Sequence, residues 1–113
     1  MSDIEILHII TAPTRYKIVL LLLERHYCVK AIAAKLGISE PAVSQQMQVL
    51  KSYGVVTGRK IDYQMHYILN HELVLRVSCA FSQSVSKYAA ENTNPENCDC
   101  EYAAHCNRRK AVK

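Results

Sequence analysis

A tight turn between two short amphipathic segments constrains the fold of this chain more than any other feature. Residues 29–36 carry an apolar face typical of a helix, and Gly37 follows them, where a helix end favours a residue that adopts positive φ. Ser39 then fits a helix N-cap, and Pro41 fits the first turn of a second helix over residues 40–53. Two helices joined by a short glycine-containing turn form a helix-turn-helix unit. The sequence therefore predicts that unit at residues 29–53.

Two further helices are predicted ahead of this unit. An apolar stretch over residues 4–10 indicates a short helix, and Pro13 opens another that runs to about His26. The segment Ile18–Leu23 in the second of these is apolar on most sides, which indicates a nearly buried helix.

After Gly54 the periodicity changes from helical to extended. Residues 55–61 and 65–69 are rich in β-branched and aromatic side chains, which predicts a β-hairpin. The intervening residues 62–64 contain no glycine, so the geometry of the turn stays open. Asn70 then fits the N-cap of a last helix that ends near residue 90.

The predicted fold is mainly α, with five helices and a two-stranded wing that together make a winged helix-turn-helix. A chain of 113 residues has room for one such domain, which we place at residues 1–90. Residues 91–113 form a polar, cysteine-containing C-terminal tail.

Basic residues are concentrated around the helix-turn-helix. Between Pro13 and Lys60 the chain has eight Lys or Arg residues and only two acids, Glu24 and Glu40. A concentrated positive segment suits a polyanion, because neutralising phosphates releases condensed counterions. An ordinary solvated surface would look the same, so charge alone does not decide between them.

The residue types on the second helix of the unit favour DNA. In a helix-turn-helix this helix enters the major groove. Glutamine donates to and accepts from a base edge at once, serine reaches phosphate or base, and no acid lies between Pro41 and Tyr53. We therefore predict a DNA-binding face that contains Ser39, Ala42, Ser44, Gln45, Gln46 and Gln48. The alternative is a three-helix protein-interaction domain with a polar outer face.

The hairpin adds cations beside that face. Arg59 and Lys60 are predicted to contact backbone phosphates or the minor groove, and the Tyr63 hydroxyl is predicted to contact phosphate. For Tyr67, packing within the sheet is the better explanation.

Three stretches resemble the ArsR/SmtB family of metal- and stress-responsive winged-helix repressors. They are residues 12–15 running into Ile18, residues 38–50 with 54–56, and His66–Tyr67, so the resemblance covers about residues 5–90. It implies a transcriptional repressor that binds a double-stranded DNA operator. Gln46 stands where many relatives have histidine, which should alter base preference rather than abolish binding.

The resemblance also implies a homodimer built from the first and last helices. The sequence supports this independently, because a small core cannot bury all of the apolar first helix and the last-helix stripe of Leu73, Val77, Phe81, Val85 and Tyr88. A two-fold dimer would present two recognition helices about 34–36 Å apart to a palindromic operator.

The known metal sites of the family do not transfer to this chain. Positions matching the zinc site of the last helix hold His71, Leu73, Ser84 and Lys87, so that site is absent. The arsenite pattern Cys-Val-Cys is reduced to Cys28-Val29-Lys30, which keeps a single thiol.

The tail holds a different set of ligands. Cys98, Cys100, Cys106 and, as a weaker candidate, His105 lie within nine residues of one another. Soft thiolates select As(III) or a soft divalent cation such as Zn²⁺, Cd²⁺ or Pb²⁺. We expect binding at this set to release the repressor from its operator. Incidental cysteines in an unstructured tail, or a structural zinc site, are the alternatives.

Two other functions stay open. Cys28 and Cys79 fit small core residues, but they would also fit a thiol-redox or reactive-sulfur switch in a regulator of the same fold. A metal-sequestering or protein-interaction module without an operator is the alternative from another class.

An enzyme is not expected, because the sequence has no nucleophile–base–acid set or phosphate loop. His8, His26 and His66 are interpreted as isolated surface or packing residues. An odd number of cysteines and an acidic N-terminus without an export signal favour a reducing cytoplasm. The longest aliphatic run is too short to cross a bilayer.

Overall fold

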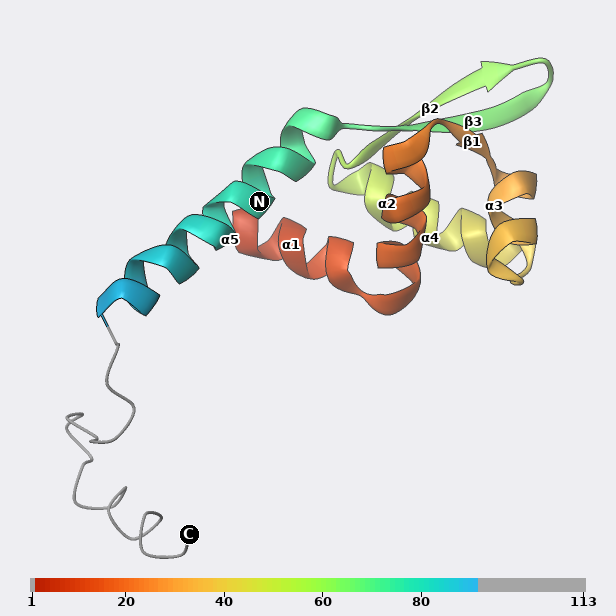
Figure 1. Cartoon of the computed structure of the whole chain (residues 1–113). Helices are drawn as coiled ribbons and strands as arrows, with labels where there is room; N and C mark the ends of the chain where they lie inside the picture. The colour runs from red at the N-terminus through yellow and green to blue at the C-terminus, as the bar shows by residue number, and fades with distance from the viewer. Residues whose placement is uncertain (1, 92–113) are drawn as a thin grey trace, which may run out of the picture. The chain divides into compact units, whose positions relative to one another are not determined.

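The computed structural model describes residues 2–91, which form five helices and a three-stranded sheet (Figure 1). In chain order the elements are α1 (Asp3–Thr11), α2 (Pro13–Glu24), β1 (Tyr27–Cys28), α3 (Val29–Leu36), α4 (Glu40–Ser52), β2 (Val56–Ile61), β3 (Gln64–Leu69) and α5 (His71–Glu91). The predicted winged helix-turn-helix is confirmed, with α3 and α4 as its two helices and β2–β3 as its wing. The chain divides into two compact units at Ser82 and Gln83, within α5.

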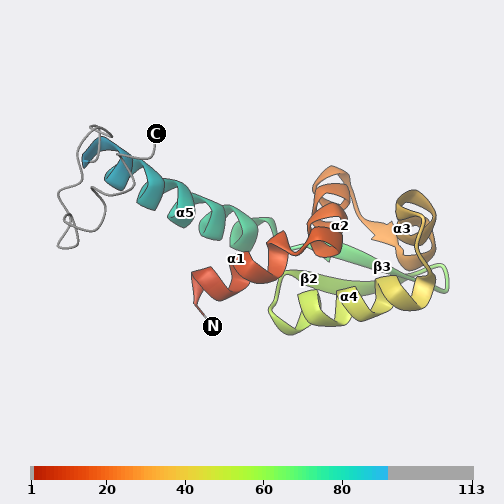
Figure 2. The ribbon, with the colours of Figure 1, turned by 90° about the horizontal axis from the view of Figure 1, so that it is seen from below.

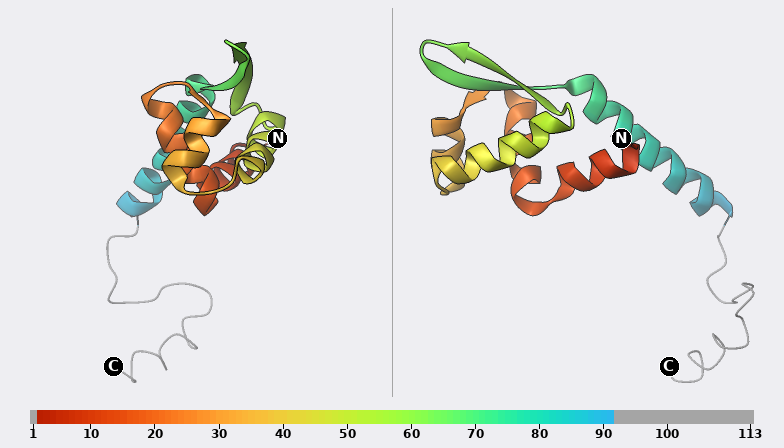
Figure 3. Two further views of the ribbon diagram at one scale, coloured as in Figure 1. Left: turned by 90° about the vertical axis from the view of Figure 1, so that its right-hand side faces the viewer. Right: turned by 180° about the vertical axis from the view of Figure 1, so that it is seen from behind.

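The first unit is built around one apolar core. Its largest fully buried side chains come from α2, α3, α4, α5 and the start of the wing, and they are Ile18, Leu22, Ile32, Val43, Met47, Leu50, Val55, Val56 and Val77. The inward stripe predicted for α4 is among them. From three further directions, α3 and α4 are seen side by side next to the hairpin (Figures 2 and 3).

Helix α2 differs from its prediction in two respects. It ends at Glu24 rather than near His26, because Arg25 is fully extended at φ −171° and ψ 173° and leads the chain into a strand. It is also not buried on most sides, since Leu20 and Leu23 are 45% and 48% exposed.

The sheet has one strand more than the sequence predicts. Its order is β1-β3-β2, all antiparallel, and β1 pairs Tyr27 with Tyr67 and Cys28 with His66. Two residues carry no periodicity of their own, so this strand exists only through its pairing with β3. It connects the chain just before α3 to the wing.

The wing closes through a two-residue turn formed by Asp62 and Tyr63. Both residues have positive φ, 49° and 68°, the combination that a type I′ hairpin turn requires. Strands β2 and β3 pair from Val56↔Leu69 to Ile61↔Gln64. Gln64, predicted to lie in the turn, is therefore the first residue of β3.

Side-chain caps hold the ends of α4 and α5. The Ser39 hydroxyl accepts from the Ala42 amide at 3.2 Å, as its sequence position predicts. Asn70 caps α5, as its sequence position predicts: its side-chain oxygen accepts a hydrogen bond from the Leu73 amide at 3.2 Å. Its side-chain nitrogen donates to the Gly54 carbonyl at 3.2 Å, so Asn70 also connects the end of α4 to the start of α5.

Among the described residues, no single helix is both long enough and apolar enough to span a membrane. Only α1 and α2 taken together, bent by 93° at their junction, satisfy that condition by length and composition.

Candidate nucleic-acid interface

The outer face of α4 is set by the turn that precedes it. Gly37 adopts φ 67° and ψ 32°, the left-handed conformation predicted for the end of α3, and the Ile38 amide donates to the Ala33 carbonyl at 3.2 Å. Val43, Met47 and Leu50 then face the core with no exposed surface. Ser44, Gln45 and Gln48 consequently lie on the exposed side, with Ser39 exposed at the N-cap.

The other two predicted contacts on α4 lie at the edge of this face. Ala42 and Gln46 are half-buried. The side-chain oxygen of Gln46 accepts a 3.0 Å hydrogen bond from Arg15 of α2, whose Nε donates to the Ile9 carbonyl at 2.7 Å. Arg15 therefore connects α1, α2 and α4, a role that neither its charge nor its place in the resembling stretch 12–15 indicates. No local pattern marks this role, because Arg15 and Gln46 are 31 residues apart.

The predicted DNA-contacting residues of the wing are exposed to solvent. Arg59 and Lys60 are exposed on β2, and Tyr63 is 93% exposed at the tip. Tyr67 is buried in the sheet, which agrees with the expectation that it packs rather than contacts a ligand.

The charge of this region is almost entirely positive. From Val29 to Lys60 the basic residues are all exposed and the only acid is Glu40; the basic residues are Lys30, Lys35, Lys51, Arg59 and Lys60. Glu40 lies in the first turn of α4, where a carboxylate is stabilised by the positive end of the helix dipole. The helix face and the wing together therefore present polar and cationic groups to solvent.

Two of the three histidines interpreted as isolated are in contact, so that interpretation was wrong for them. Nδ1 of His26 lies 3.0 Å from Nδ1 of His66, and the ring centroids are 5.0 Å apart. The residues are 40 positions apart in sequence and meet because β1 pairs with β3. His8 is exposed on α1, as interpreted.

Two of the five cysteines, Cys28 and Cys79, lie in the part of the chain that the structure describes. Cys28 is a half-buried free thiol in β1 and Cys79 is an exposed free thiol on α5. Cys98, Cys100, Cys106 and His105 lie outside the described residues. Within residues 2–91, no three side chains of His, Cys, Asp or Glu are grouped to hold a metal ion.

Comparison with known proteins finds relatives in one family of regulators. Residues 12–57, which run from the start of α2 to the wing, match the model of "Bacterial regulatory protein, arsR family". The chain is 40% identical over 70 residues to the HTH-type transcriptional repressor SmtB of Mycobacterium tuberculosis. A solved structure described as a possible transcriptional regulator for arsenical resistance is 28% identical and superposes with a TM-score of 0.66, over 83% of this chain and 100% of that one. Together these matches support an ArsR/SmtB winged helix-turn-helix regulator.

Other ArsR/SmtB relatives agree with this assignment. A transcriptional repressor SmtB homolog from Synechocystis is 34% identical over 65 residues, which cover 56% of this chain and 49% of that protein. The solved transcriptional repressor BigR from Xylella fastidiosa is 28% identical, with a TM-score of 0.57 over 68% of this chain and 80% of that one. The match to the Mycobacterium repressor covers 61% of this chain and 52% of that protein, so the chain spans about half the length of the curated relatives it matches. The family is one of regulatory proteins, in agreement with the expectation that the chain is not an enzyme.

Proposed function

We propose that this chain is a transcriptional repressor that binds duplex operator DNA through α4 and the β2–β3 wing. The observation that carries the proposal is the outer face of α4, where Ser44, Gln45 and Gln48 are exposed and no acid follows Glu40. Amide side chains on such a face match the donor and acceptor pattern of adenine in the major groove. The exposed Arg59 and Lys60 supply the cations that phosphate contacts require.

The test is fluorescence anisotropy of labelled duplex DNA titrated with the protein at several salt concentrations. A DNA-binding protein loses affinity steeply as salt rises, and Arg59→Ala should lower the slope of log K against log salt by about 1. Arg76→Ala is the matched control, because Arg76 is a cation on α5 that pairs with Asp3 at 3.3 Å. Equal slopes for wild type and Arg59→Ala would remove the wing from the proposal. Absence of salt-sensitive binding to any duplex would favour a protein-interaction or metal-sequestering module instead.

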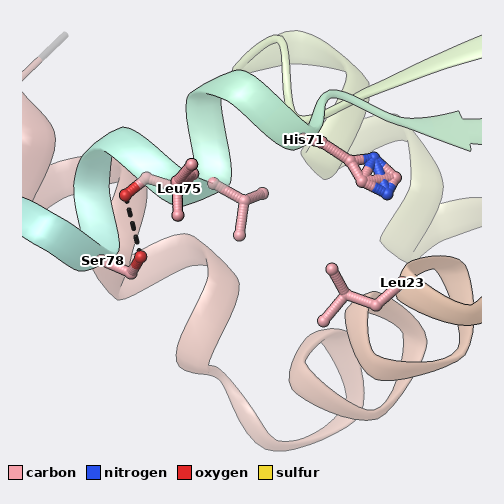
Figure 4. A pocket seen from close by; sticks show the side chains of 5 residues that line it. Leu23, His71, Leu75 and Ser78 are labelled. Carbon is pink, nitrogen blue, oxygen red and sulfur yellow. Dashed lines mark hydrogen bonds between the residues drawn. The ribbon is translucent and has the colours of Figure 1, made fainter.

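We propose that the active form is a homodimer. In the first unit, Leu20 and Leu23 of α2 and Leu75 and Phe81 of α5 are between 45% and 64% exposed. Leu23, Val74 and Leu75 also line an open hollow of about 470 Å³ together with His71 and Ser78 (Figure 4). Apolar side chains gathered in this way mark an interaction surface in a soluble protein. A second copy is the expected occupant, since a two-fold axis would give two copies of α4 for two half-sites.

The dimer is tested by sedimentation velocity of the full chain. Leu75→Glu and Phe81→Glu should shift the protein from dimer to monomer and weaken operator binding, because each places a carboxylate in an apolar contact. Tyr63→Glu at the wing tip is the control and should leave the dimer intact. Ile4→Glu would not serve as a control, because α1 is part of the expected interface. A wild-type chain that sediments as a monomer at all concentrations would overturn the proposal.

We propose that a thiophilic metal or metalloid bound by the tail releases the repressor. The support is chemical, since Cys98, Cys100 and Cys106 with His105 are soft ligands close together in sequence. The likeness to a possible regulator for arsenical resistance favours As(III), and Zn²⁺, Cd²⁺ and Pb²⁺ share the same ligand preference. The ligand would need to bind the conformer with low DNA affinity better by only a few kcal/mol.

The effector is tested by operator mobility shift with arsenite, Cd²⁺, Pb²⁺ and Zn²⁺, on wild type and on Cys98→Ser. Release of wild type by one of these ions, with Cys98→Ser unresponsive, is the expected result. If all four leave DNA affinity unchanged, the tail is not a metal sensor. Release by an oxidant instead, lost in Cys28→Ser or Cys79→Ser, would favour the thiol-redox regulator.

A further inference from the structure

We propose that His26 and His66 form a binding site for a first-row transition-metal ion at the base of the wing. Their Nδ1 atoms face each other at 3.0 Å, and the two rings meet edge to face at an interplanar angle of 64°. His26 is exposed and His66 is half-buried, so solvent reaches the pair. This site is separate from the tail cysteines and requires no DNA.

The backbone holds both imidazoles in place. His66 lies in the middle strand of the sheet, between Cys28 of β1 and Arg59 of β2. His26 directly precedes β1, and its carbonyl accepts a 3.3 Å hydrogen bond from Nε of Arg25. Cys28 is paired directly with His66, so these two side chains point to the same side of the sheet, and His26 lies two residues before Cys28. The pairing of β1 with β3 therefore brings the short connection that carries His26 next to His66.

The separation of the two nitrogens fits neighbouring ligands of one metal ion. Metal–nitrogen bonds of about 2.0–2.1 Å to two atoms 3.0 Å apart enclose an angle of about 95°. Angles near 90° suit the cis positions of a tetragonal ion such as Ni²⁺ or Cu²⁺, both of which accept imidazole. A tetrahedral Zn²⁺ would require the nitrogens to separate by a few tenths of an ångström.

Binding requires a change of tautomer and no net loss of a proton. In the hydrogen-bonded pair one Nδ1 carries a proton and the other accepts it. Moving that proton to Nε2 of the same ring, through solvent, leaves a lone pair on each Nδ1. Both imidazoles then bind the ion in their neutral form.

The surroundings limit the affinity of this site. Arg25 precedes His26, and Arg59 is directly opposite His66, so two cations oppose an incoming dication. Cys28 of β1 is the partner of His66 on the strand that lies across from β2. The described residues nevertheless contain no group of three possible metal ligands. The ion would therefore complete its coordination with water, and its binding should be weaker than in a closed structural site.

The experiment is isothermal titration of the full chain with Ni²⁺, which does not oxidise thiols. The background is the variant Cys98→Ser, Cys100→Ser, Cys106→Ser and His105→Gln, which removes the tail ligands. One Ni²⁺ per chain should bind, and His26→Gln and His66→Gln should each weaken binding by about tenfold or more. His8→Gln is the matched control and should leave the affinity unchanged.

The titration results distinguish a metal-binding histidine pair from two histidines that only hydrogen-bond to each other. Loss of binding in either pair variant, with wild-type circular dichroism retained, supports the site. His26→Gln is the more informative variant, because His26 is exposed and its loss opens no cavity. Absence of Ni²⁺ binding in the tail-free background would overturn the proposal, as would equal binding by the background and both pair variants.

Discussion

The substitution Arg15→Ala should destabilise the fold and leave the salt dependence of DNA binding unchanged. Arg15 donates to the Ile9 carbonyl at 2.7 Å and to the Gln46 side chain at 3.0 Å. Ile9 lies in the last turn of α1, where carbonyl groups have no partner within the helix. A hydrogen bond from a charged donor contributes about 1.5–3 kcal/mol, and water replaces part of each bond at this half-buried position. We therefore expect a total loss of about 2–3 kcal/mol in the free energy of unfolding.

Urea denaturation followed by circular dichroism measures this loss. Arg15→Lys keeps the charge but cannot hold two acceptors in fixed directions, so it should lose about half as much. Lys17→Ala is the control, because Lys17 is an exposed cation on the same helix and its loss should change stability by less than about 0.5 kcal/mol. The slope of unfolding free energy against urea should stay constant across the series.

The DNA measurement distinguishes an internal connection from a phosphate contact. Removing a phosphate contact lowers the slope of log K against log salt by about 1, as expected for Arg59→Ala. Arg15 is committed to Ile9 and Gln46, so Arg15→Ala should keep the wild-type slope even where affinity falls through misplacement of Gln46. A lower slope in Arg15→Ala, combined with unchanged stability, would refute the reasoning.

Three further predictions concern stability measured by denaturation of the full chain. Asn70→Ala removes the cap of α5 and the hydrogen bond to the Gly54 carbonyl, so it should lower the free energy of unfolding measured in urea by about 1–2 kcal/mol. A decrease below about 0.3 kcal/mol would contradict this prediction. Tyr63→Gly removes an aromatic residue from φ 68° and should raise stability by about 0.5–1 kcal/mol in thermal denaturation, whereas a decrease would show that Tyr63 is not strained. Gly37 has φ 67° and open space where a Cβ would lie, so backbone strain is the expected effect of a substitution. Gly37→Ala should lower the free energy of unfolding by about 1 kcal/mol, and Gly37→Asn should lower it by less. Equal decreases for the two variants would exclude backbone strain as the cause.

Local patterns were sufficient to predict the helices from the sequence. As helix caps, Gly37, Ser39 and Asn70 act on neighbours within four residues, so these capping roles follow from their positions in the chain, whereas the bond from Asn70 to Gly54 does not. The inward stripe of α4 follows in the same way from helical spacing. The exposed residues Ser44 and Gln45 were predicted to face outward for that reason, and the structure places them there.

Features that join distant parts of the chain were not predicted. Strand β1 is two residues long and has no pattern, so only its pairing with β3 reveals it. The same pairing brings His26 to His66, which sequence reasoning had separated. Helix α2 ended earlier than expected for the same reason, since Arg25 must extend to enter β1. The tip of the wing was uncertain because Asp62 and Tyr63 adopt a turn that normally includes glycine or asparagine.

The short pairing of β1 with β3 has a mechanical consequence. Helix α3 begins at Val29, immediately after a strand that is hydrogen-bonded to the hairpin. A force that tilts the hairpin is therefore transmitted through backbone hydrogen bonds to the start of α3 and, through the packing of α3 on α4, to α4. If the proposed operator contacts form, a duplex that displaces the hairpin would also shift α3 and α4, so the DNA contacts of the wing and of α4 would not be independent of each other.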